Sequence, residues 1–333
     1  MAPDNAAGAP RPARAKGQLG WTVRLLFAIG LIVLILHNLN LGEFQAVVVA
    51  PRWLPLVGMV VTALIFVLLG AVNIWIMLSA LAPLQFVTVL RYYLVATAFG
   101  TFTPAGVGDF SLVAFLRREA VPVHRGLSIM LVDRGVTLTL YTVIYLPLTL
   151  LLVFATTQWL WLPVAFAIAV IGALAANLIA SLRRWLLDTV VRRFLPRLED
   201  FLRTCSDLVR FHPMYLLADV AVTVVRSVVA GVVIEMALWA SGTHAGFGQV
   251  VVVTNSLSLL NFIPVSLSGV GVYEGGAVAL FSQLGLSRER VFAAFVFHRI
   301  YMLLFAMLML AVSRLLLRRG SYSEVMTEAE VKP

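Results

Sequence analysis

Two short stretches decide the fold that this sequence predicts: residues 101–109 read TFTPAGVGD, and residues 261–274 read NFIPVSLSGVGVYE. They interrupt the apolar segments 85–116 and 248–284. Proline and glycine cannot continue a lipid-facing helix, and backbone groups freed at membrane depth must be buried in protein or line a wet cavity. Each segment is therefore predicted to form a helix, a break and a second helix, either as a re-entrant hairpin or as two short crossings. The break residues are Pro104, Gly106, Gly108, Pro264, Gly269 and Gly271.

The sequence around these breaks is that of a polytopic membrane protein. It is 61% hydrophobic and 12% charged, whereas soluble domains carry about 25% charged residues. This composition argues against a soluble enzyme. Six further apolar runs have the roughly 18 to 25 residues that span a bilayer: 21–41, 53–81, 126–155, 160–182, 213–240 and 291–317. The predicted fold class is all-α, with about six transmembrane helices and two broken helical hairpins.

The basic residues flank these runs, so the net charge of +9 fits membrane topology and indicates no nucleic-acid partner. Seven arginines lie in 183–210, whereas the predicted outer loops hold Arg52, Arg288 and Arg290. The positive-inside rule then places both termini in the cytoplasm, and we expect a plasma membrane location, in bacteria the inner membrane. Residues 1–20 and 318–333 are predicted tails around one membrane domain, 21–317. Within it, 183–212 is predicted to be an amphipathic cytoplasmic linker that favours anionic inner-leaflet lipids, or a simple connecting helix.

The chain also contains a predicted internal repeat. Shifting the sequence by 165 residues places Asp109 on Glu274, Arg125 on Arg290 and Arg134 on Arg299 without a gap. The repeat units, about 53–155 and 213–317, begin three crossings apart and are therefore predicted to be inverted. Inverted repeats with broken helices are typical of secondary transporters. The alternative is that duplication merely builds a large bundle.

Charged residues inside the predicted membrane region are the candidate site, because each costs roughly 2.5 to 3.5 kcal/mol to insert. We predict pairing within each unit, Asp109 with Arg134 and Glu274 with Arg299, near the start of each returning helix. One interpretation is that these are structural ion pairs. The other is that at least one arginine is free, in one conformation, to bind a phosphate, for which the forked guanidinium is well suited.

Four further residues are secondary candidates. Asp133 and His298 directly precede the repeat arginines and would extend their network or cap a helix. Arg226 and Glu235 lie in the fifth apolar run and are candidates for lining a cavity or for pairing with another helix. The chain has one cysteine, Cys205, and five scattered histidines. We therefore expect no metal site and no cofactor.

At these same residues the sequence resembles the flippase-like membrane family that includes the N-terminal domain of lysylphosphatidylglycerol synthases. The matching features are the proline, glycine and acid pattern of 104–109, the pair Asp133-Arg134, the stretch 261–274 and the pair His298-Arg299. The resemblance implies a bundle of six to eight helices that moves a lipid, in the best-known members an aminoacylated phosphatidylglycerol, from the inner to the outer leaflet.

The resemblance carries the family's charged positions onto Asp109, Arg134, Glu274 and Arg299. One departure concerns the chemistry. Members that make their own aminoacyl lipid have a large soluble transferase after the membrane domain, whereas 16 residues follow Leu317 here. We therefore expect this chain not to synthesise that lipid, and its substrate could be another anionic lipid, a polyprenyl-linked sugar or a hopanoid-type lipid.

Three hypotheses follow for the function. The first, which the repeat and the intramembrane arginines favour, is a lipid translocator that is not an enzyme and moves an anionic or phosphate-bearing lipid between leaflets. The second is an integral-membrane transferase that acts on a lipid carrier. The third is a non-catalytic membrane partner that recruits a separate, soluble lipid-modifying enzyme through the basic segment 183–210.

Overall fold

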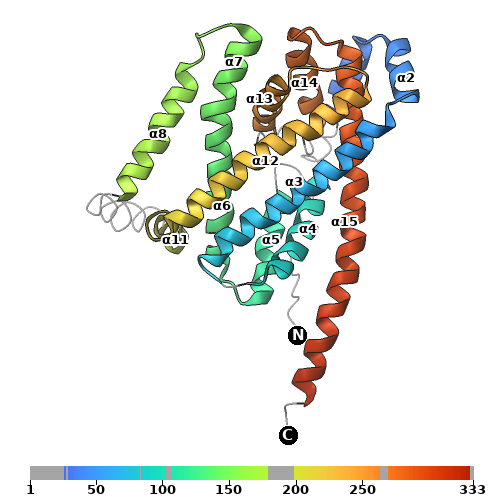
Figure 1. Cartoon of the computed structure of the whole chain (residues 1–333). Coiled ribbons are helices and arrows are strands. Elements are labelled where there is room, and N and C mark those ends of the chain that lie inside the picture. The colour runs from blue at the N-terminus through green and yellow to red at the C-terminus, as the bar shows by residue number, and fades with distance from the viewer. Residues whose placement is uncertain are drawn as a thin grey trace, which may run out of the picture.

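The computed structural model describes residues 26–27, 29–82, 84–102, 107–178, 199–262 and 269–330, and every regular element within them is a helix (Figure 1). Among these residues, four helical stretches are long and apolar enough to cross a membrane. They are α3 (Trp53–Ser79), α12 (Pro213–Ala240), the first part of α15 (Arg288–Glu330), and a stretch made of α6 (Val123–Leu140), a π-helical turn η3 (Tyr141–Tyr145) and α7 (Leu146–Phe154). These helices confirm four of the six predicted spans.

The first predicted span, 21–41, is wrong at its end. The described helix there ends at His37, and the chain bends by 106° into α2 (Leu41–Val49). The Asn40 side chain causes the new start, because its Oδ1 accepts hydrogen bonds from the backbone N–H groups of Gly42 and Glu43. The fourth predicted span begins as expected with α8 (Trp161–Leu178), and its predicted end at 182 lies outside the described residues.

Each predicted break lies between two helices of the structure. The first hairpin consists of α4 (Phe86–Phe102) and α5 (Val107–Leu116), which pack against each other. The second hairpin consists of α13 (Phe247–Leu257), a 3-10 turn η6 (Ser258–Phe262) and α14 (Val272–Gln283). The breaks at 103–106 and 263–268, and with them Pro104, Gly106 and Pro264, lie outside the described residues.

The elements follow one order in both predicted units. A long helix, a broken hairpin and a second long helix occur as α3, α4–α5, α6–α7 and again as α12, α13–α14, α15. In Figure 1, α3 and α12 run in opposite directions, and the two hairpins lie toward opposite ends of the bundle. This arrangement agrees with an inverted repeat, whose symmetry itself stays a prediction from the sequence.

Two equivalent arginines make the same kind of contact, each within its own unit. Arg125, in the first turn of α6, donates from Nη1 to the Leu81 carbonyl (3.2 Å), two residues after α3 ends. Arg290, in the first turn of α15, donates from Nη1 to the Gly242 carbonyl (2.9 Å), two residues after α12 ends. A cation at a helix C-terminus is favoured by the helix dipole and by its unsatisfied carbonyl groups. The residues that the 165-residue shift aligns therefore play the same structural part.

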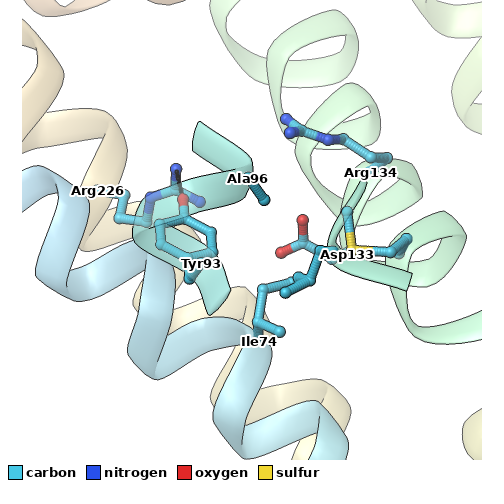
Figure 2. Close-up of a pocket in the computed structure, with 8 residues that line it drawn as sticks. Ile74, Tyr93, Ala96, Asp133, Arg134 and Arg226 are labelled. Carbon is cyan, nitrogen blue, oxygen red and sulfur yellow. Dashed lines mark hydrogen bonds between the residues drawn. The ribbon is translucent and has the colours of Figure 1, made fainter. Parts of the chain in front are cut away.

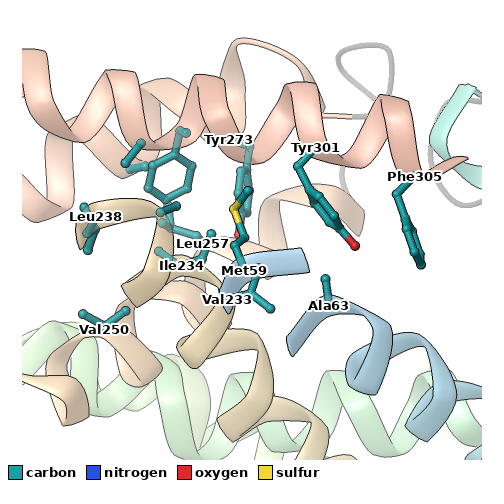
Figure 3. Packing of buried hydrophobic residues seen from close by; sticks show 14 of the residues in the cluster. Met59, Ala63, Val233, Ile234, Leu238, Val250, Leu257, Tyr273, Tyr301 and Phe305 are labelled. Carbon is teal, nitrogen blue, oxygen red and sulfur yellow. The ribbon is translucent and has the colours of Figure 1, made fainter. Parts of the chain in front are cut away.

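Two hydrophobic cores flank the central pair α3 and α12, which pack along each other. One lies among α12, α13, α14 and α15 (Figure 3), where Phe281 and Phe295 are fully buried, and the other lies among α3, α4, α5 and α6. Small residues permit the close helix contacts that membrane bundles use. A Cβ added at Gly231 would lie 2.9 Å from the Val251 Cα, so α12 and α13 could not approach as they do.

Candidate functional site

A cavity of about 970 Å³ lies between the two units. It is large for a binding site, since typical ligand pockets measure about 300 to 1,000 Å³. Arg134 from α6, Arg226 from α12 and Arg299 from α15 all line it. Three guanidinium groups that are far apart in the sequence thus face one space, and His298 is a fourth predicted residue on its wall.

Arg299 and Glu274 form the ion pair that the sequence predicts. Arg299 donates from Nε (2.8 Å) and from Nη2 (2.6 Å) to Glu274 Oε1. The Glu274 side chain is 7% exposed and that of Arg299 is 19% exposed, so the carboxylate is buried while the guanidinium reaches the cavity. Such a charge-assisted pair offsets the cost of holding both groups away from water.

The break before α14 fixes the position of Glu274. Its second oxygen, Oε2, accepts the backbone N–H of Gly271 (2.7 Å), which precedes the first turn of the helix. Gly271 has φ +83° and Gly269 has φ +74°, a left-handed conformation that L-residues other than glycine adopt at a cost. These two predicted break residues therefore give the chain the turn that aims Glu274 at Arg299.

The corresponding pair in the first unit is not decided, because the side chain of Asp109 lies outside the described residues. Arg134, its predicted partner, is half-buried and lines both the large cavity and a smaller pocket beside it. Gly108 and Asp109 both lie in the first turn of α5. The prediction that Asp109 pairs with Arg134 stays a prediction.

Arg226 is held by aromatic residues. Its guanidinium carbon lies 4.7 Å from the centroid of the Phe66 ring, and its Nη2 donates to the Tyr93 hydroxyl at 3.4 Å. A cation over an aromatic face is stabilised more strongly where water is excluded. Glu235, the other candidate in α12, is buried beside Trp239 and is not among the residues that line the cavity.

A buried polar cluster beside the cavity includes residues that the sequence argument did not single out as site residues. Asn73 of α3 donates from Nδ2 to Asp133 Oδ1 (2.6 Å) and to Thr223 Oγ1 (3.1 Å) of α12. Asp219, one turn before Thr223, is fully buried in the same cluster. Asp133 is thus part of a network with Asn73, and the predicted extension of the arginine network stays a prediction. Each polar member interrupts an apolar run, which was the available signal in the sequence.

One end of the cavity is open. Its lining there comes from Val123 and His124 at the start of α6 and from Asp200 and Phe201 at the start of α11 (Glu199–Phe211), where Val123 and Asp200 are exposed. α11 is anchored to α6 because Ser128 Oγ donates to the Phe201 carbonyl at 3.0 Å. Within the described residues, no group of three or more His, Cys, Asp or Glu side chains could hold a metal ion.

The family model that describes the lysylphosphatidylglycerol synthase TM region matches residues 21–309. The chain belongs to this family. Neither the curated proteins nor the solved structures that were compared with the chain contain a match. The family resemblance predicted from the sequence is thus confirmed, and the matched region includes both hairpins, the cavity and the buried polar cluster. Membership of the lysylphosphatidylglycerol synthase TM family indicates a role connected with membrane lipids.

Proposed function

We propose that this protein is a lipid translocator and not an enzyme: it moves a phosphate-bearing, anionic lipid between the leaflets of the membrane. The observation that carries the proposal is the cavity between the two units, which Arg134, Arg226 and Arg299 line together. Arg299 is paired with Glu274 in this structure, and three guanidinium groups around one space also favour an anion that can join them. A lipid phosphate is such an anion, and guanidinium groups can bind two of its oxygens at once.

The rest of the cavity suits the lipid's apolar part. Leu131 is 51% exposed and Phe262 is 39% exposed, and both line the cavity. Apolar side chains at its edge would let acyl chains stay in the bilayer while the headgroup moves along the arginines. This division of the substrate removes the largest barrier to lipid exchange, which is the passage of a charged headgroup through hydrocarbon.

The open end indicates where the lipid would enter. The segment before α6 carries Arg117 and Arg118, and α11 carries Arg203 and Arg210, so the mouth lies at the more basic end of the bundle. By the positive-inside rule this end would be cytoplasmic, and the described state would accept lipid from the inner leaflet. The core that contains Phe281 and Phe295 lies toward the opposite end of the bundle. Exchange of conformations between the units would open that end in turn.

Reconstitution tests the proposal. In liposomes that contain the purified protein, an impermeant quencher should with time reach the fluorescent phosphatidylglycerol of both leaflets. In protein-free liposomes it should reach the lipid of the outer leaflet alone. Arg134→Ala/Arg299→Ala should slow exchange at least tenfold, because each arginine contributes to binding the phosphate. Arg52→Ala is the matched control, since Arg52 precedes α3 and is not among the residues lining the cavity. Exchange by the double variant at the wild-type rate would contradict the proposal.

A further inference from the structure

The buried polar cluster beside the cavity contains two carboxyl groups that the proposed transport path does not use. Asp133 of α6 is 3% exposed and Asp219 of α12 is fully buried. Asn73 holds Asp133 in place, because its amide donates to Asp133 Oδ1 and is itself fixed by a second hydrogen bond to Thr223 Oγ1. Neither oxygen of Asp219 has a hydrogen-bond partner among the described residues. A buried carboxylate without a donor is a strongly unfavourable arrangement.

The neighbour of Asp219 explains how this arrangement can be stable. Asp219 lies against Asp133, within reach of a hydrogen bond between the two carboxyl groups if one of them is protonated. Arg226 cannot replace that bond, since it lies seven residues further along α12, about 10 Å along the helix axis. Arg226 is also engaged by Tyr93 and by the Phe66 ring. Two carboxylates that share a dry site repel each other when both are ionised, so the pair favours the state that holds one proton.

A small pocket lies between Asp133, one member of the pair, and the arginines Arg134 and Arg226. It has a volume of about 10 Å³ and is bounded by Asp133, Arg134, Tyr93 and Arg226 (Figure 2). That volume is about the least that holds one water molecule, which needs polar partners on several sides. Figure 2 shows the Asp133 carboxylate on the wall opposite Tyr93 and Arg226. Because Arg134 and Arg226 also line the large cavity, the pocket at Asp133 adjoins the proposed lipid path.

The charged and titratable groups around the pair come from several elements. α4 contributes Tyr93, α6 contributes Arg134, η3 contributes Tyr141 and α12 contributes Arg226. α3 contributes the uncharged Asn73, and α5 faces the pocket with Leu112. α11 packs on α6 with Phe201 and Cys205 against Ser128, and its Asp200 lies at the cavity mouth. α15 contributes His298 and Arg299 on the cavity wall.

We propose that Asp133 and Asp219 form a proton-binding site and that this proton is transported together with the lipid. The inference rests on the proposed function. When the pair is fully ionised, its two negative charges attract Arg134 and Arg226 and compete with a lipid phosphate for them. When the pair holds a proton, it attracts Arg134 and Arg226 less strongly, so these arginines bind the phosphate more strongly. Proton binding and phosphate binding thus favour each other, and such coupling is reciprocal.

The charges also balance. A phosphodiester lipid carries one negative charge and the proton carries one positive charge, so the pair of substrates crosses the low-dielectric region as a neutral load. Transport of this kind is driven by a pH gradient and is insensitive to membrane potential. For one proton per lipid, a gradient of one pH unit supports an accumulation ratio of up to about tenfold.

The test uses the full chain in liposomes with a fluorescent phosphatidylglycerol and an imposed pH difference of one unit. We expect wild-type protein to enrich the lipid in the leaflet that faces the alkaline side, up to about tenfold, and to lose the enrichment when nigericin collapses the gradient. Asp219→Asn and Asp133→Asn should lose the enrichment. Glu235→Gln is the matched control, because it removes another buried acid of α12 that is not part of the pair.

The outcomes separate the two proposals. Wild-type exchange that ignores the pH gradient would overturn the proton site and leave translocation standing. Enrichment by Asp219→Asn equal to wild type would also overturn the proton site. A wild-type protein that exchanges no lipid would contradict both proposals.

A spectroscopic measurement covers variants that fail to fold. Infrared spectra of wild-type protein at neutral pH should contain the carbonyl stretch of a protonated carboxylic acid, which shifts in heavy water. The band should persist in Glu235→Gln and disappear in whichever of Asp133→Asn and Asp219→Asn folds. Absence of the band in the wild type, or its loss in Glu235→Gln, would overturn the site.

Discussion

Replacement of Arg299 by methionine should separate the structural part of the ion pair from its part in transport. The substitution keeps an unbranched side chain and removes the charge. Glu274 would then be a carboxylate that is 5% exposed and that keeps one donor shown by the structure, the backbone N–H of Gly271 at 2.7 Å. Removing one partner of a buried pair in this way costs about 3 to 5 kcal/mol, because the remaining charge is uncompensated.

The double variant Glu274→Gln/Arg299→Met should recover most of that loss. A glutamine amide oxygen can still accept the Gly271 N–H, and no uncompensated charge remains in the pair. Replacing both members of a buried pair by groups of similar volume is often neutral. We therefore expect the double variant to be close to the wild type in stability, while it has lost a cavity guanidinium.

Thermal unfolding of the purified protein in detergent, followed by tryptophan fluorescence, measures the stability effect. At about 2.1 cal/mol/K of unfolding entropy per residue, a loss of 1 kcal/mol lowers the Tm of a chain of 333 residues by about 1.4 °C, so Arg299→Met should lower it by about 4 to 7 °C. Both variants should be slow in lipid exchange. If the double variant is as unstable as the single one, the uncompensated Glu274 charge is not the cause. If the double variant exchanges lipid at the wild-type rate, Arg299 is not a ligand of the phosphate.

Three further predictions concern the framework. Gly271→Ala should cost about 1 to 2 kcal/mol because of its φ of +83°, seen as a lower Tm, whereas Gly275→Ala, whose added Cβ makes an ordinary contact at 3.5 Å with Ile35, should not lower it. Arg125→Ala and Arg290→Ala should each cost about 1 kcal/mol by losing a hydrogen bond to a carbonyl after a helix end. Similar Tm losses in the two variants are expected, and a loss in one alone would contradict their equivalence. Burial raises the pKa of the Cys205 thiol, so less thiolate is present at pH 7. The Cys205 thiol of the wild-type protein should react with a maleimide more slowly than an exposed thiol does. The rate of this reaction should increase as the pH rises.

Much of the fold could be predicted from the sequence because its strongest signals are local. Length and apolarity alone predict α3, α12 and α15, since lipid requires every backbone group to be satisfied within the segment. Proline and glycine, which break helices, predict both hairpins. The Glu274–Arg299 pair was also predictable, because few charges occur inside the apolar segments and each needs a partner.

The remaining features depend on packing between helices, which no local pattern encodes. Asn73 and Asp133 are 60 residues apart in the sequence. They meet because α3 and α6 both pack beside α12. The bend after His37 depends on Asn40, which caps α2. Asparagine is typical of a helix start, but here it lies within a continuous apolar run, which predicts an unbroken helix. Helix periodicity puts Asp219 on the same face of α12 as Arg226, seven residues later, but its neighbour in the structure, Asp133, comes from another helix.

The two units differ at one pair of aligned positions beside the repeat arginines, and this difference bears on the direction of the proposed transport. Asp133 in the first unit aligns with His298 in the second, 165 residues later. In the second unit the neighbouring Arg299 is bound to Glu274, whereas in the first unit Asp133 turns to Asn73 and lies against Asp219. Two units that exchange conformations symmetrically can only equilibrate a lipid. The proposed proton site joins Asp133 of the first unit to Asp219 of the second, and the aligned positions, His298 and Leu54, hold no acid. Such a site would remove that symmetry and tie movement to the pH gradient. Asp219→Asn should therefore leave a passive exchanger, which distributes the lipid equally whatever the gradient.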